Sequence, residues 1–92
     1  MANLVAYRVL YRGKVQGVGF RAAACRIAAR FPVAGWVRNL PDSRVELLVE
    51  GAEADVMAFL QDVRAYWEGY IEEEQIDPRT PSGLYRTFDV VR

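Results

Sequence analysis

The hydrophobic pattern of this sequence changes twice from the period of a strand to the period of a helix. Alternating apolar and polar side chains indicate strands, and apolar side chains repeated every three or four positions indicate helices. The strands expected from this pattern are residues 5–12, 33–39, 44–50, 71–76 and 85–91, and the expected helices are residues 20–31 and 53–68. This order predicts an antiparallel sheet of four to five strands with two helices on one face, an α+β sandwich of two layers.

The composition is that of a globular chain. Hydrophobic residues make up 52% and charged residues 26% of the 92 positions, which suffices for one core, so we expect a single domain over residues 1–92. A disordered chain would have fewer apolar residues. No uncharged stretch approaches the roughly 18 apolar residues of a transmembrane helix, and the first residues do not resemble a secretion signal. We therefore expect a cytoplasmic protein that does not bind a membrane.

The absence of histidine removes several kinds of chemistry, because neither a Ser-His-Asp triad nor a Cys-His dyad can be assembled. Cys25 is the only cysteine, so a disulfide within the chain and a cysteine metal cage are excluded as well. Cys25 follows Arg21 by four positions, and we interpret it as a packed, unreactive thiol rather than a nucleophile. We interpret Glu72–Glu74 as a solvated strand edge, since neighbouring strand residues point to alternate faces and cannot surround a cation.

Charge is distributed unevenly along the chain. Residues 1–46 contain eight Lys or Arg against two Asp or Glu, whereas residues 47–92 contain four against ten. The excess of positive charge in the N-terminal half suggests an anionic partner, unless folding brings the two halves together and cancels the field.

The loop from Gly13 to Gly19 is the strongest candidate for a binding site. It has three glycines in seven residues and leads directly into the first expected helix, where Arg21 lies in the first turn. Free amides at a helix N-terminus attract anions, and a guanidinium offers paired donors to phosphate oxygens. The alternative is a simple strand-to-helix turn with a solvated Arg21. The loop matches neither the Walker A nor the dinucleotide-binding pattern.

Two segments of the sequence resemble the signatures of the acylphosphatase family. Residues Gly13 to Arg21 read GKVQGVGFR, and residues Gly35 to Asn39 read GWVRN; both resemble family signatures and stand in the family's order. The resemblance extends over essentially the whole chain. It implies a ferredoxin-like fold and an enzyme that hydrolyses the carboxyl-phosphate bond of acyl phosphates without a metal or cofactor.

The resemblance also implies the roles of individual residues. Arg21 would bind the phosphoryl oxygens and Asn39 would orient the attacking water, these two being the catalytic residues. The amides of loop 14–20 would cradle the phosphoryl group. The phosphate-binding residues implied are Gln16, Gly17, Val18, Gly19, Phe20 and Arg21. A small-molecule acyl phosphate is the expected partner, a phosphate or sulfate ion could occupy the same site, and we expect a monomer that binds no nucleic acid.

The expected reaction suits a chain without histidine. An acyl phosphate expels a carboxylate, which is a good leaving group and needs no strong general acid. The site must still stabilise the charge on the phosphoryl oxygens and align the attacking water. Fixed hydrogen-bonding groups can perform both tasks. The carboxamide of Asn39 can accept a hydrogen bond from water, although it is too weak a base to remove a proton.

Two other functions compete with this interpretation. The first is a noncatalytic module that binds phosphate or another anion through the same loop. The second is a single-strand RNA binder with Trp36 and Tyr11 as stacking residues, although we expect both rings to lie in the core. The chain also departs from the family where Asp42-Ser43 replaces Asp-Gly, at Ala22–Ala24 where larger residues are common, and at residues 66–70.

Overall fold

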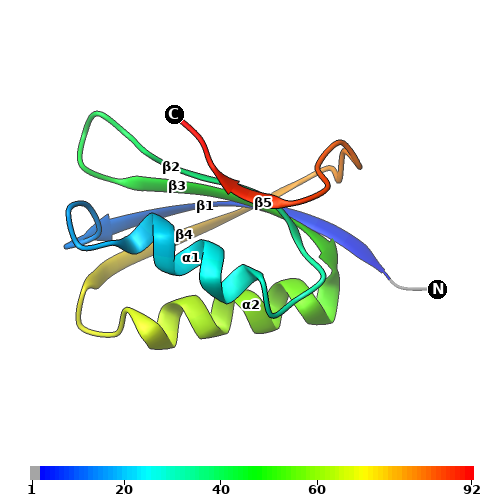
Figure 1. Ribbon diagram of the computed structural model, residues 1–92, viewed down its shortest axis with the longest axis horizontal. Coiled ribbons are helices and arrows are strands. Elements are labelled where there is room, and N and C mark those ends of the chain that lie inside the picture. The colour runs from blue at the N-terminus through cyan, green and yellow to red at the C-terminus, as the bar shows by residue number, and fades with distance from the viewer. Residues whose placement is uncertain (1–2) are drawn as a thin grey trace.

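The computed structural model describes residues 3–92, in which two helices lie on one face of a five-stranded sheet (Figure 1). The elements in chain order are β1 (Leu4–Gly13), α1 (Phe20–Ala28), β2 (Ala34–Asn39), β3 (Val45–Ala52), α2 (Glu53–Tyr66), β4 (Ile71–Arg79) and β5 (Phe88–Val90). The predicted ferredoxin-like α+β sandwich is confirmed. No helix formed by the described residues is long and apolar enough to cross a membrane.

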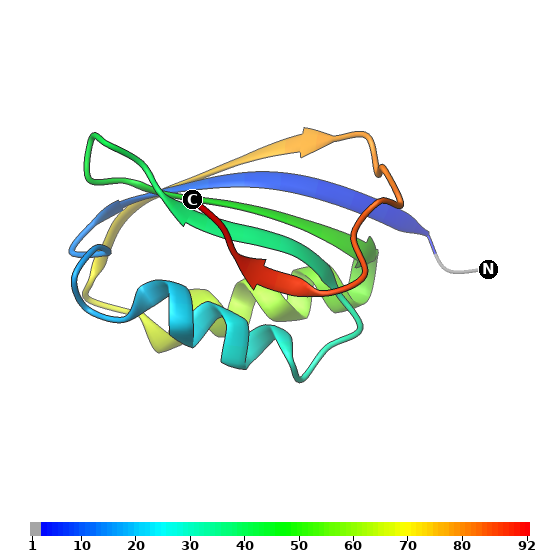
Figure 2. The same ribbon diagram turned by 45° about the horizontal axis from the view of Figure 1, so that its top comes forward.

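The sheet is mixed rather than purely antiparallel. Its strand order is β4-β1-β3-β2-β5, in which the first four strands pair antiparallel and β5 pairs parallel with β2, from Gly35↔Phe88 to Val37↔Val90. The expectation of an antiparallel sheet is therefore wrong for the last strand. The reason is topological. β4 runs opposite to β2, and the segment 80–87 crosses one end of the sheet to its other edge, so β5 returns in the direction of β2 (Figure 2).

Several boundaries differ from the expected ones. α1 ends at Ala28, three residues before the predicted end, because Pro32 disfavours helical backbone in the residue before it. The chain tightens there, with Arg30 N–H donating to Ile27 O and Phe31 N–H to Ala28 O at 3.1 and 3.0 Å, the spacing of a 3₁₀ turn. β4 extends through Pro78 to Arg79, which an edge strand allows because its outer amides need no partner.

The core lies between the sheet and the two helices. The largest fully buried side chains include Tyr11 from β1, Leu47 from β3 and Phe59 from α2. Phe20, the first residue of α1, is 1% exposed, and its ring lies 5.0 Å from Tyr11 and 5.2 Å from Trp67 between ring centroids. The start of α1, which follows the glycine loop, is thereby anchored in the core.

Trp36 lies outside the core, contrary to the prediction, whereas Tyr11 is buried as expected. Alternation along β2 directs Val37 to the helices, and Trp36 therefore occupies the opposite face of the sheet. There its indole N–H donates to the Tyr85 hydroxyl at 3.2 Å, and the Arg38 guanidinium lies 5.2 Å from the ring centroid. The Trp36 ring is therefore half-buried, with its indole N–H bonded to Tyr85 and its face covered by Arg38.

Candidate functional site

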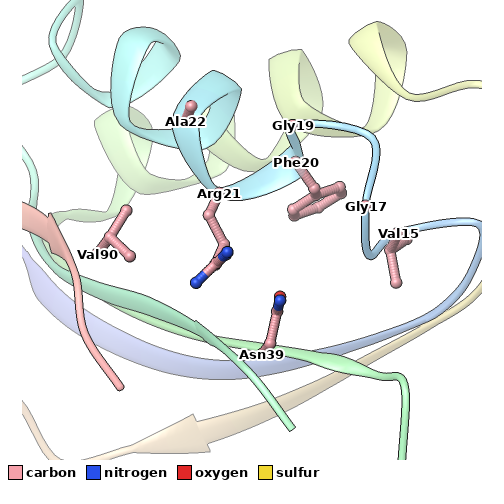
Figure 3. A pocket seen from close by; sticks show the side chains of 8 residues that line it. All are labelled: Val15, Gly17, Gly19, Phe20, Arg21, Ala22, Asn39 and Val90. Carbon is pink, nitrogen blue, oxygen red and sulfur yellow. The ribbon is translucent and has the colours of Figure 1, made fainter.

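A cavity of about 260 Å³ opens where the glycine loop, the start of α1, the end of β2 and β5 meet (Figure 3). Arg21 and Asn39, to which the family resemblance assigns the catalytic roles, both contribute to its wall, although they lie 18 positions apart in the chain. The lining residues are Val15, Gly17, Gly19, Phe20, Arg21, Ala22, Asn39 and Val90. The fold therefore brings the two signature segments together at one cavity.

The backbone of the loop turns its amides away from internal partners. Gly17 and Gly19 adopt the left-handed backbone conformation, with φ of 74° and 86°. Residues that carry a side chain rarely adopt this conformation. A Cβ at either position would meet no atom within 4 Å, so glycine is required for conformation rather than for space. Within residues 3–92, none of the amides of residues 15–22 donates a hydrogen bond to another group that meets the usual geometric criteria. These amides are available to a ligand.

The field at this end of α1 favours an anion. Gly19 is the N-cap and supplies no side-chain hydrogen bond, and the first turn of the helix contains no acidic residue. The positive end of the helix dipole is therefore uncompensated by the chain's own groups.

Arg21 points from the first turn of α1 into the cavity (Figure 3). It is half-buried, and among the described residues no carboxylate lies within ion-pair distance of its guanidinium. Other arginines of the chain are paired: Arg12 lies 3.1 Å from Glu72 and 3.5 Å from Glu73, and these contacts join the basic and acidic halves of the sequence. Arg21 therefore presents to the cavity a positive charge that no carboxylate among the described residues neutralises.

Asn39 is the last residue of β2, and its carboxamide points across the cavity toward Arg21 (Figure 3). Its Oδ1 is buried and has no hydrogen-bond partner among the described residues. A buried acceptor without a partner costs roughly 1–3 kcal/mol. Such a group is poised to gain a hydrogen bond from a molecule that enters the site.

Gln16 occupies a different place from the other predicted phosphate-binding residues. Its Nε2 donates to the carbonyl oxygens of Leu40 and Arg44, both at 2.8 Å, so its side chain is directed to the β2–β3 turn and not into the cavity. The Gln16 side chain thus ties the glycine loop to the turn that follows Asn39. Val18 also directs its side chain outward and is 39% exposed. For both residues only the backbone amide remains as a ligand donor.

Two lining residues, Ala22 and Val90, were not anticipated from the sequence, whereas Val15 was expected through its amide in loop 14–20. Ala22 carries no polar group that would mark it as a site residue. Val90 lies far along the chain in β5 and reaches the cavity because β5 pairs with β2. No sequence signal could have placed Val90, since its position depends on the crossover to the far sheet edge.

The turn between β2 and β3 places Ser43 in left-handed backbone. Ser43 has a φ of 71°, the only positive φ of a residue other than glycine within residues 3–92. The neighbouring Asp42 carboxylate accepts hydrogen bonds from the Arg44 Nε at 2.9 Å and from the Arg44 amide at 3.2 Å. The bond from the Arg44 side chain lowers the pKa of Asp42. The turn is therefore held by its neighbours while Ser43 carries the backbone strain.

Replacing Ser43 by glycine should stabilise the protein. The left-handed conformation costs an L-residue about 1–2 kcal/mol and costs glycine little, while glycine loses more entropy on folding. We expect Ser43→Gly to raise the free energy of unfolding by about 0.5–1 kcal/mol in urea denaturation. Ser43→Ala is the matched control, because it removes the hydroxyl and keeps the strain. A rise that is equal in both variants, or absent from Ser43→Gly, would contradict the assignment of strain.

Cys25 and Glu72–Glu74 take no part in the cavity. Cys25 packs against the core, and burial, followed by the charge of Asp89, raises the pKa of its thiol, which keeps it protonated. Glu72–Glu74 lie on edge strand β4, where Arg12 contacts the first two, and Arg64 lies 2.8 Å from Glu74. The packing of Cys25 and the edge position of Glu72–Glu74 are confirmed. The interpretation of a solvated edge holds for Glu72 and Glu73 but is wrong for Glu74, whose side chain is 13% exposed because it lies beside buried Tyr11 on the helix-facing side of the sheet. Among residues 3–92 no group of three acidic or cysteine side chains is placed to hold a metal ion.

Comparison with known proteins agrees with this geometry. The Acylphosphatase family model matches residues 7–90, which include all the lining residues. The chain is 44% identical to an acylphosphatase of Gloeobacter violaceus, over 100% of this chain and 99% of that protein. The crystal structure of acylphosphatase from Bacillus subtilis superposes with a TM-score of 0.86 at 30% identity, covering 96% of this chain and 99% of that one. Full-length HypF in its phosphate- and nucleotide-bound form matches with a TM-score of 0.81 at 28% identity, over 100% of this chain but 12% of that one.

Proposed function

We propose, from the fact that this chain belongs to the acylphosphatase family, that Arg21 and the loop amides bind the phosphoryl group of an acyl phosphate while Asn39 positions water. The chain is an acylphosphatase, like its full-length relatives, and its substrate is a small acyl phosphate. The observation that carries the residue assignment is that Arg21 and Asn39 line one cavity together with Gly17, Gly19 and Phe20 of the loop. Among residues 3–92, the Arg21 guanidinium has no ion pair, the Asn39 Oδ1 has no partner, and the amides of these loop residues donate to no other group.

The phosphoryl group is held by charge and by fixed donors. A phosphoryl dianion at the N-terminus of α1 accepts hydrogen bonds from amides that have no other partner, so no bond within the protein is lost. The guanidinium of Arg21 adds two parallel donors to adjacent oxygens. Because Phe20 is anchored in the core and the Gln16 side chain holds the loop to the β2–β3 turn, these donors need little reorganisation during the reaction.

Asn39 acts on the attacking water. Its Oδ1 accepts a hydrogen bond from the water and so directs the oxygen lone pair at phosphorus. The water oxygen forms a bond to phosphorus on one side while the bond from phosphorus to the acyl oxygen breaks on the other. The electron pair leaves with the carboxylate, and one water proton passes to a phosphoryl oxygen. The products are a carboxylate and dihydrogen phosphate.

The proposed reaction uses no metal. The carboxylate leaving group is stable as an anion, and Arg21 with the helix N-terminus supplies the positive charge that a divalent cation provides in other phosphoryl transfers. The chain is proposed to act as a monomer, in which Arg21 and Asn39 already meet at one cavity within one fold.

A chelator experiment tests this proposal. The purified protein should hydrolyse acetyl phosphate and benzoyl phosphate at the same rate with and without EDTA, measured as released phosphate. Loss of turnover in EDTA that Mg²⁺ restores would contradict the metal-free mechanism. Binding of inorganic phosphate without hydrolysis of either compound would instead identify a noncatalytic anion-binding module, and salt-dependent binding of an oligonucleotide would favour an RNA binder.

A further inference from the structure

We propose that the acyl group of the substrate packs against Ala22 and Val90, and that the small side chain at position 22 sets the size of acyl group the site accepts. This proposal rests on the proposed function, because it assumes that the phosphoryl group occupies the loop and Arg21. It concerns the part of the cavity that the phosphoryl group does not use.

The lining divides into a polar half and an apolar half. Arg21, Asn39 and the loop amides form the polar half, and among residues 3–92 Arg21 is the only charged side chain that lines the cavity. Four apolar side chains form the remainder, but those of Val15 and Phe20 are each 1% exposed and belong to the core. Ala22 is exposed and Val90 is 45% exposed, so these are the apolar side chains that a ligand in the mouth of the cavity contacts.

The direction of the reaction assigns the acyl group to this apolar half. In an in-line displacement the leaving oxygen lies opposite the attacking water, and the water is held by Asn39. Figure 3 shows Ala22 on the far side of Arg21 from Asn39, with Val90 on the neighbouring strand β5. An acyl group that points away from Asn39 therefore passes over Ala22 and Val90.

The size of residue 22 decides how much room this path offers. Ala22 lies in the first turn of α1, directly after Arg21, and presents only a methyl group. A larger side chain here would extend over the mouth of the cavity without entering the core, because Ala22 is exposed. The wall is apolar, so contact favours an apolar acyl group, and a bulky one uses more of the wall than acetyl does.

The experiment compares kcat/KM for benzoyl phosphate with kcat/KM for acetyl phosphate in each variant. Ala22→Leu should lower this ratio about tenfold, since adding or removing one methylene in an apolar pocket commonly changes specificity by about 10-fold or more. Val90→Ala removes wall area from the opposite element and should lower the ratio about threefold. Ala54→Leu, at an exposed alanine of α2 that does not line the cavity, is the matched control and should leave the ratio unchanged.

Each result has one meaning for the proposal. An unchanged ratio in Ala22→Leu and Val90→Ala, or an equal loss for both substrates, would overturn it, because residue 22 would then act on the phosphoryl end or not at all. Because Ala22 is exposed, Ala22→Leu disturbs no core contact, and thermal unfolding of each variant verifies this. Failure of the proposed function itself is distinguishable, since it would appear as normal turnover after Arg21→Ala and Asn39→Ala.

Discussion

Arg21→Ala is expected to lower kcat/KM for benzoyl phosphate by about 10²–10³-fold. In the part of the chain that the structure describes, Arg21 is the only charged side chain that lines the cavity, and removing one positioned donor to a developing oxyanion commonly costs about that factor. The same change should weaken competitive inhibition by inorganic phosphate, because the guanidinium binds the phosphoryl group before as well as during the reaction. Steady-state kinetics with phosphate as inhibitor measures both effects.

The loss of activity by Arg21→Ala should come without a loss of stability. Arg21 has no carboxylate partner among residues 3–92 and lies at the positive end of α1, where a second positive charge opposes the helix dipole. Thermal unfolding should therefore be unchanged or slightly raised. Arg26→Ala, at an exposed arginine of the same helix, is the matched control and should retain full turnover. Turnover of Arg21→Ala within about threefold of the unmodified protein would disprove the assignment.

Asn39→Ala is expected to lower kcat for benzoyl phosphate by about 100-fold while KM and the inhibition constant of inorganic phosphate change little. The carboxamide acts on the water and not on the phosphoryl group, so its removal affects the reaction and leaves ground-state binding intact. This separation distinguishes Asn39 from Arg21, whose removal should affect both quantities. The two patterns can be compared in one series of initial-rate measurements.

Folding should tolerate Asn39→Ala. The Asn39 Oδ1 is buried and has no partner, so its removal relieves a cost instead of breaking a bond. Asn3→Ala replaces the other asparagine of the chain, which is exposed, and should have no effect on turnover. Asn39→Asp should also be inactive, because the added carboxylate would repel the phosphoryl group and pair with Arg21. A raised KM together with an unchanged kcat in Asn39→Ala would show that Asn39 binds substrate and does not position water.

The order and type of the elements could be predicted because most of them have a clear period. Residues 53–68 have an unbroken apolar stripe, and the structure places α2 at Glu53–Tyr66. The five-residue spacing of Ile71 and Ile76 was harder to interpret, because it contradicts strand alternation. The structure explains the spacing: the register shifts between Arg12 and Gly13, so that Glu72 is passed over in the pairing of β1 with β4. A bulge of this kind depends on the partner strand and leaves no local signal.

Trp36 illustrates the limit of reasoning from hydrophobicity. A large aromatic residue in a strand favours the core, yet Val37 and Gly35 face the helices and alternation leaves Trp36 on the other face. Its contacts with Tyr85 and Arg38 come from a distant loop and from the next-but-one residue. Which of two adjacent apolar side chains faces the core is decided by register, and register is set between strands.

The sequence by itself determined the chemistry that this protein has available. The chemistry depends on local features: the loop glycines, Arg21 and Asn39. Each contributes a backbone conformation or a functional group that belongs to a single residue. The tertiary structure alone decided how these groups are arranged. It forms the cavity that Arg21 and Asn39 line, directs the Gln16 side chain to the β2–β3 turn, and places Val90 at the mouth of the cavity. These depend on the pairing of β5 with β2 and on the packing of α1 against the sheet. Contacts between segments distant in the chain are set by the balance of packing over the whole fold, and no short segment encodes that balance.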